Sequence, residues 1–146
     1  MKKPASALAA AAVAALVAAS LALGGRASEI MLGAKLTAAA EVPAQVVKDT
    51  KAKGSFTGDL AGKKLTWRLT FSGLTGPATA AHIHMGAAGK SGPVVVALCG
   101  PCKSGAKGTA TLTASVLKAL KKHLLYVNVH TGKNPNGEIR GQLSEH

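Results

Sequence analysis

The sequence predicts an all-β fold, namely a two-sheet antiparallel β-sandwich with one short helix. Residues 64–72 alternate apolar and polar side chains, which is the period-two pattern of a half-buried strand. About eight short strand candidates follow one another, each bounded by glycine, proline, asparagine or serine. The 17 glycines supply turn residues, and strands at this spacing favour two packed antiparallel sheets.

The clearest predicted pair of strands is a hairpin. Residues 55–60 form its first strand, residues 64–72 form its second, and Ala61 and Gly62 lie at the turn. The apolar side chains of the second strand share one face: Leu65, Trp67, Leu69 and Phe71. This face is therefore expected to contribute to the core.

The remaining elements are short. A helix is predicted over residues 115–122, because apolar residues recur there at helical spacing, with Thr113 or Ser115 as its cap. Six further strands are predicted, over residues 30–38, 79–84, 93–98, 108–113, 124–130 and 138–143.

Residues 1–27 are predicted to be a secretory signal peptide. A basic start, Met1 to Lys3, precedes the apolar or small-residue run of residues 5–23. Gly25 and Ala27 supply the small side chains that cleavage needs, so the mature chain is expected to begin at Ser28. The alternative is an uncleaved membrane anchor, since the run approaches the roughly 20 residues that span a bilayer. Residues 28–146 are then one secreted or periplasmic domain, with no later membrane span expected.

The chain is strongly basic. Its 18 lysines and arginines face six acidic residues, and loss of residues 1–27 lowers the basic count to 15, for a net charge of +9. In an exported protein this charge favours anionic cell-surface components as partners. Nucleic acid is not expected as a partner, because the lysines are scattered and only four aromatic residues could stack on bases.

Three histidines form a candidate metal site. His82 and His84 lie two residues apart on a predicted strand and therefore share one face, while Ile83 points the other way. His130, near the end of another predicted strand, supplies a third imidazole if the two strands are neighbours. Imidazoles so placed can hold copper or zinc. The alternative is a group of surface histidines with no ligand.

Two other features bear on this site. Met85 follows the histidine pair, and because a thioether favours copper over zinc it is an additional candidate ligand. Cys99 and Cys102 form a CGPC sequence that follows a strand instead of opening a helix, which argues against thioredoxin chemistry. In an oxidising compartment the pair is expected to form a disulfide, with a two-cysteine metal site as the alternative.

The carboxylates do not indicate a hydrolase. Glu41 and Glu138 are too separated to argue for a pair of catalytic acids, and no serine lies in a nucleophile elbow. Glu138 and Arg140 share a strand face. They are therefore expected to form a structural ion pair with each other or with a neighbour.

Three segments carry a resemblance to a known family: "LTAAAEVPA", "AAHIHMGAAGKSGPVVVAL" and "LYVNVHTGKNPNGEIRGQL", in that order. Together they span nearly all of residues 36–143. Through them the chain resembles the CHRD domain family, which was first described in chordin and occurs in bacterial exported proteins. The resemblance implies an immunoglobulin-like, superoxide-dismutase-like β-sandwich.

Copper/zinc superoxide dismutases hold copper partly through a His-x-His strand and a late Val-His strand end. By this similarity, His82, His84 and His130 look like three of the copper ligands. The chain departs from the dismutase pattern because only His123 lies between His84 and His130, so no bridging histidine or zinc-binding loop is recognisable. Dismutase activity is therefore not expected.

Three functions remain as hypotheses. The first is storage or buffering of one metal ion, copper before zinc, at His82, His84 and His130. The second is a non-enzymatic module that binds another protein or an anionic surface and uses the histidines structurally. The third is a copper-dependent redox enzyme.

Overall fold

The structure is a computed structural model that describes residues 28–42 and 51–146. The predicted signal peptide, residues 1–27, lies outside the described residues. Within them, no helix has the length and apolar character that crossing a membrane requires. The elements are β1 (Glu29–Thr37), η1 (Ala38–Ala40), β2 (Lys53–Ala61), β3 (Lys64–Ser72), β4 (Ala78–Met85), β5 (Val94–Cys99), β6 (Ala106–Thr111), α1 (Ala114–Leu120), β7 (Leu125–Thr131), β8 (Ile139–Gln142) and β9 (Ser144–Glu145).

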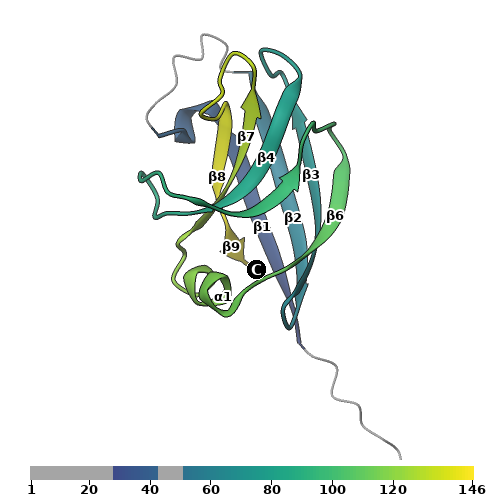
Figure 1. The fold of residues 1–146 in the computed structure, drawn as a ribbon, viewed down its shortest axis with the longest axis vertical. Helices are drawn as coiled ribbons and strands as arrows, with labels where there is room; N and C mark the ends of the chain where they lie inside the picture. The colour runs from purple at the N-terminus through teal and green to yellow at the C-terminus, as the bar shows by residue number, and fades with distance from the viewer. Residues whose placement is uncertain (1–27, 43–50) are drawn as a thin grey trace, which may run out of the picture.

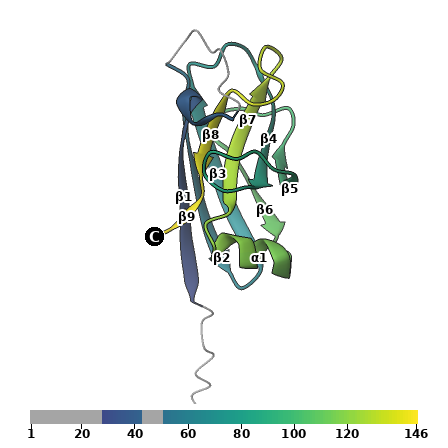
Figure 2. The same ribbon diagram turned by 90° about the vertical axis from the view of Figure 1, so that its left-hand side faces the viewer.

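The strands form two layers that belong to one hydrogen-bonded sheet. Eight strands follow the order β5-β4-β7-β8-β1-β2-β3-β6, and β9 pairs with β1. Figures 1 and 2 show β5, β4 and β7 in one layer and β1, β2 and β3 in the other, with β8 at one side of the molecule and β6 at the other. The predicted antiparallel sandwich is confirmed. It differs in that the layers are joined through β8 and β1, where Arg140 pairs with Thr37.

The core lies between the two layers. Side chains that alternate along the strands fill it, among them Leu65 and Leu69 from β3 and Val127 from β7, all without exposed surface. Helix α1 covers one end of the core with Val116, Ala119 and Leu120. Its cap is Thr113, whose hydroxyl accepts a hydrogen bond from the Val116 amide at 3.3 Å.

The predicted strands and helix are found within two residues of their expected positions. The predicted hairpin of β2 and β3 is found, but Ala61 is the last residue of β2, opposite Lys64, so the turn comprises Gly62, in the left-handed region at φ 60°, and Lys63. The sequence did not indicate the two-residue strand β9 or the short helix η1. Both are too short to carry a repeating pattern of side chains.

The junction between the layers depends on a close approach of two backbones. A Cβ atom placed on Gly141 of β8 would overlap the carbonyl oxygen of Lys35 in β1. Glycine is therefore required at this position, because any side chain would push the two strands apart.

We expect Gly141→Ala to lower the free energy of unfolding by about 3 kcal/mol, because the added methyl group meets rigid backbone. Urea denaturation followed by circular dichroism measures this change. Gly76→Ala is the matched control, since a Cβ there meets nothing within 4 Å. Equal stability of the two variants would contradict the proposed close contact.

Candidate metal centre

The pairing of β4 with β7 places three histidines on the outer face of one layer. Opposite each other across the two strands lie Ala80 and His130, His82 and Asn128, and His84 and Tyr126. Paired residues of antiparallel strands point to the same face, so the histidines are neighbours. The alternate residue Ile83 is buried in the core.

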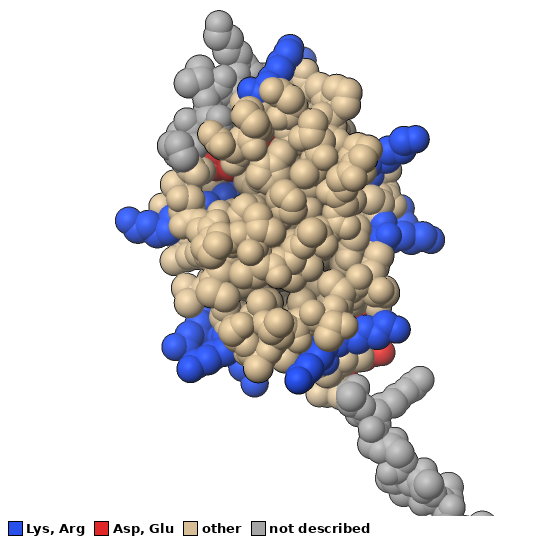
Figure 3. All heavy atoms as spheres, in the orientation of Figure 1, with Lys and Arg blue, Asp and Glu red and all other residues tan. Residues whose placement is uncertain are grey.

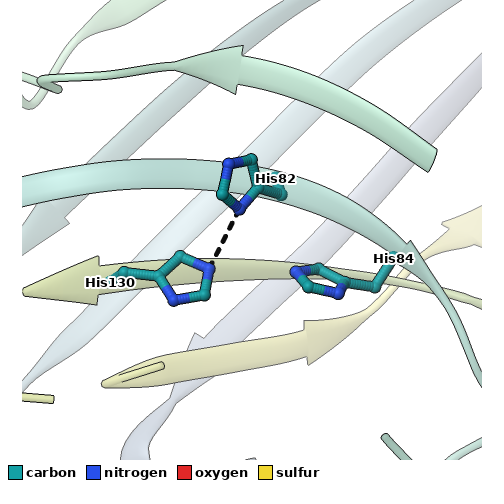
Figure 4. A group of neighbouring side chains, drawn as sticks. All are labelled: His82, His84 and His130. Atoms are coloured by element: carbon teal, nitrogen blue, oxygen red, sulfur yellow. Dashed lines mark hydrogen bonds between the residues drawn. The ribbon is translucent and has the colours of Figure 1, made fainter. Parts of the chain in front are cut away.

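The three imidazoles converge as the sequence predicted (Figure 4). One ring nitrogen from each of His82, His84 and His130 lies within 4.8 Å of the other two. The shortest approach joins His82 Nδ1 to His130 Nε2, at 3.1 Å. All three residues are half-buried, so the group lies near the surface.

Backbone carbonyl groups fix the orientation of two rings. Nδ1 of His84 lies 2.9 Å from the carbonyl oxygen of Gly92, and Nδ1 of His130 lies 2.9 Å from that of Pro135. A carbonyl oxygen can only accept, so both Nδ1 atoms carry the proton and both Nε2 atoms present a lone pair. This arrangement is typical of histidines that bind metals.

The remaining hydrogen bond follows from these proton positions. Because His130 Nε2 has no proton, His82 Nδ1 must donate to it. His84 Nε2 is buried and has no hydrogen-bond partner among the described residues. A buried nitrogen with a free lone pair is costly unless a further group binds it.

The surroundings keep the three rings neutral. Burial lowers the pKa of His82, and the neighbouring imidazoles lower it further. Burial also lowers the pKa of His84 and of His130, although the bonds to Gly92 and Pro135 oppose the shift. The neutral form predominates at pH 7, and it is the form that binds a metal ion.

The donor set can accommodate one ion after a small adjustment. Zinc and copper bind imidazole nitrogen at about 2.0 Å, so nitrogens around one ion lie about 3.3–3.6 Å apart. The present limit of 4.8 Å therefore requires the rings to close by about 1 Å. Binding at His82 Nδ1 would also displace its proton to Nε2.

A stack of two side chains packs against one face of the His84 ring. The Tyr126 ring lies parallel to the His84 ring with centroids 4.9 Å apart, and the Arg140 guanidinium lies 3.4 Å from the centroid of Tyr126. Arg140 also donates to the carbonyl oxygens of Ala87 and Lys90, in the loop that contains Gly92. Arg140 thus holds both the ring and the loop that orients His84.

Glu138 organises the loop that orients His130. Its side chain has no exposed surface, and it accepts hydrogen bonds from the backbone amide and hydroxyl of Thr75, the hydroxyl of Thr131 and the side-chain amide of Asn134. Burial alone would raise the pKa of Glu138, but these hydrogen bonds outweigh it and lower the pKa. The loop between Thr131 and Glu138, which carries the Pro135 carbonyl, is fixed by this network.

Glu138 and Arg140, which were expected to pair with each other or with a neighbour, do not pair with each other; the charge of Arg140 interacts instead with the neighbouring carboxylate of Glu41. Glu138 binds the loops at one end of the layer, and Arg140 binds Tyr126 and the loop at residues 86–93. The ion pair was expected because both residues share one strand face, but each side chain binds other groups. The sequence also gave no indication that each residue holds a loop beside the histidines.

Glu41, which follows η1, is a second buried carboxylate. Asn128 donates to both of its oxygens, at 2.7 and 2.9 Å. Burial raises the pKa of Glu41 to about 7, opposed by the Arg140 charge and by the hydrogen bonds from Asn128 and the Val42 backbone. This pair was not predicted from the sequence, because the two residues lie far apart along the chain.

The other candidate residues lie outside the histidine group. Met85 packs against the hydrophobic core, on the face of β4 opposite His84. Cys99 and Cys102 are joined as a disulfide, with their sulfur atoms 2.16 Å apart. His123 and His146 are exposed and do not join the three histidines.

The raised pKa of Glu41 predicts a pH effect on stability. Between pH 4.5 and about 7 the folded state keeps a proton that the unfolded state releases, so the free energy of unfolding falls as pH rises. Glu41→Gln removes this contribution. Relative to the parent, the variant should gain about 3 kcal/mol of stability between pH 5 and pH 8.

Urea denaturation of both proteins at the two pH values measures this gain. The histidines titrate in both proteins, so their contribution cancels in the comparison. The control is Glu145→Gln, which changes an exposed carboxylate. A difference between Glu41→Gln and parent that does not change with pH would contradict a carboxyl group protonated near pH 7.

Comparison with known protein families identifies a family for this chain. A family model described as the CHRD domain matches residues 32–143, which include the three histidines, Glu138 and Arg140. No curated protein and no solved structure matches the chain. The family match covers most of the sequence and agrees with the resemblance of the three sequence segments. The chain therefore belongs to the CHRD domain family.

Proposed function

We propose that this protein is an exported metal-binding protein that holds one copper ion through His82, His84 and His130. The convergence of three imidazole nitrogens within 4.8 Å is the observation that carries the proposal. Its role is storage, buffering or transfer of the ion. The predicted signal peptide and the Cys99–Cys102 disulfide support an oxidising, extracytoplasmic compartment.

The ligand atoms proposed are Nδ1 of His82 and Nε2 of His84 and His130. The carbonyls of Gly92 and Pro135 leave these Nε2 atoms unprotonated and aim them at the group. The unpartnered, buried Nε2 of His84 supports a missing ligand at this point. Three neutral donors from two rigid strands favour binding, because little side-chain entropy is lost.

Copper is proposed before zinc for a general reason. Imidazole suits both metals, but affinity for a given nitrogen site is higher for copper(II) than for zinc. In the described residues, the metal-binding group contains three histidines and no carboxylate. We propose metal binding instead of a redox reaction, because binding requires only these three ligands.

We expect titration of the mature protein with copper(II) to reveal one site per chain. Visible absorption and electron paramagnetic resonance should both saturate at one equivalent. His130→Ala should weaken binding more than tenfold, because it removes one of three ligands.

The matched control is His123→Asn, which removes an exposed histidine outside the group. His123 has φ 55°, a conformation that asparagine also adopts, so the fold should be unaffected. Equal copper affinity of the His130→Ala variant and the parent would contradict the proposal. The hydrogen bond between His82 and His130 would then indicate a structural cluster in an interaction module.

A further inference from the structure

The second layer has a separate surface feature on its outer face. Side chains that point away from the core of β1, β2, β3 and β6 are aligned in rows by the strand register. We name one part of this surface the basic face. It comprises four cations, Lys35, Lys53, Arg68 and Lys107, and the hydroxyl residues between them, Ser55, Thr57, Thr70 and Ser72.

Two of the cations are placed unfavourably for folding. Arg68 of β3 and Lys107 of β6 are direct cross-strand partners, so their side chains lie side by side on one face. Like charges in this position destabilise a sheet. None of the four cations of the basic face forms an ion pair within 4.0 Å in the described part of the chain. A negatively charged ligand would therefore relieve the repulsion between Arg68 and Lys107.

Among the described residues, no carboxylate is a direct cross-strand partner of a cation of the basic face. Glu41 and Glu138 are buried near the other layer, and Glu29 lies at the opposite end of β1. Asp59 is the nearest carboxylate along the strands, and it is paired with Thr66, one side-chain row from Arg68. Successive side-chain rows on one face of a strand are about 6.6 Å apart.

The charge is unevenly distributed over the molecule. Figure 3 views the layer of β4 and β5, where the middle of the surface is almost free of charged side chains and lysines and arginines project at the rim. The basic face belongs to the other layer and lies over its strands. A ligand would therefore meet a local group of cations on this layer, in addition to the net positive charge of the protein.

The basic face is also hollowed. One hollow, bounded by β1 and β2, includes Lys35, Ser55 and Thr57 in its lining, and extends beyond the basic face to Met31 and Asp59. A second hollow, bounded by β2 and β3, is lined by residues that include Lys53, Ser55 and Thr70. Ser55 belongs to both, so the hollows adjoin. Each hollow thus contains one lysine of the basic face, and Arg68, the cross-strand partner of Thr57, borders the first hollow.

We propose that the basic face binds an anionic polysaccharide. Sulfate or carboxylate groups of the polymer pair with Arg68 and Lys107, and with Lys35 and Lys53 farther along. The serine and threonine hydroxyls between the cations bond the hydroxyl groups of the sugars. We choose this partner on the basis of charge complementarity. Its negative groups would pair with cations that form no ion pair in the described part of the chain.

Other polyanions fit this surface less well. Anchoring of a surface in a membrane uses apolar side chains that insert among the lipids, in addition to cations that attract the headgroups. Among the described residues of this layer, Met31 is the exposed large apolar side chain; it lies opposite Asp59 and lines the hollow bounded by β1 and β2, so this surface offers a single apolar side chain. Single-stranded nucleic acid needs aromatic platforms, whereas Trp67 of β3 points into the core.

The test uses the mature protein with two probes, heparin as a sulfated polysaccharide and polygalacturonate as a carboxylated one. The parent should bind at least one of them, with affinity that falls as salt is added. The double variant Arg68→Gln/Lys107→Gln should bind about tenfold more weakly. Its thermal stability should be equal to or above that of the parent, since the variant removes a repulsive pair.

The control variant Lys121→Gln/Lys122→Gln removes two exposed charges after α1, away from the basic face. It should retain most of the affinity of the parent. The proposal is overturned if the parent binds neither probe, or if the two double variants lose affinity equally. It is also overturned if vesicles rich in phosphatidylserine bind the protein more tightly than both polysaccharides.

Discussion

The candidate site depends on the register between β4 and β7. With Ile83 opposite Val127, both side chains enter the core, and His82, His84 and His130 are left together on the outer face. A shift of one residue would send the imidazoles into the core and the aliphatic side chains to the surface. The cost of burying unpaired polar rings therefore fixes the register, and with it the arrangement of the three histidines.

Buried polar groups then set the fine geometry. Glu138 holds the loop whose Pro135 carbonyl orients His130, and Arg140 holds the loop whose Gly92 carbonyl orients His84. These residues would be poor candidates for a direct functional role, because their hydrogen bonds are already used. Their contribution is to fix the proton of each ring, which decides the nitrogen that can bind an ion.

Much of the fold could be predicted from sequence because strand alternation is a local pattern, as in β3. The pairing of His130 with the His82 strand could be stated only as a condition, since local patterns do not specify strand neighbours. Contacts between distant residues were not predictable for the same reason. Glu41 and Asn128 lie 87 residues apart, and nothing near either of them marks the other as its partner.

The proposed metal site uses particular nitrogen atoms, and nuclear magnetic resonance of the imidazole rings tests this assignment most directly. In the metal-free protein, long-range 1H–15N correlations should place the proton on Nδ1 of His82, His84 and His130. Zinc, as a diamagnetic probe of the same donor set, should shift Nε2 of His84 and His130 and Nδ1 of His82, with the His82 proton moving to Nε2. Protons on Nε2 of His84 or His130 in the free protein, or metal-dependent shifts confined to His123 and His146, would contradict the account.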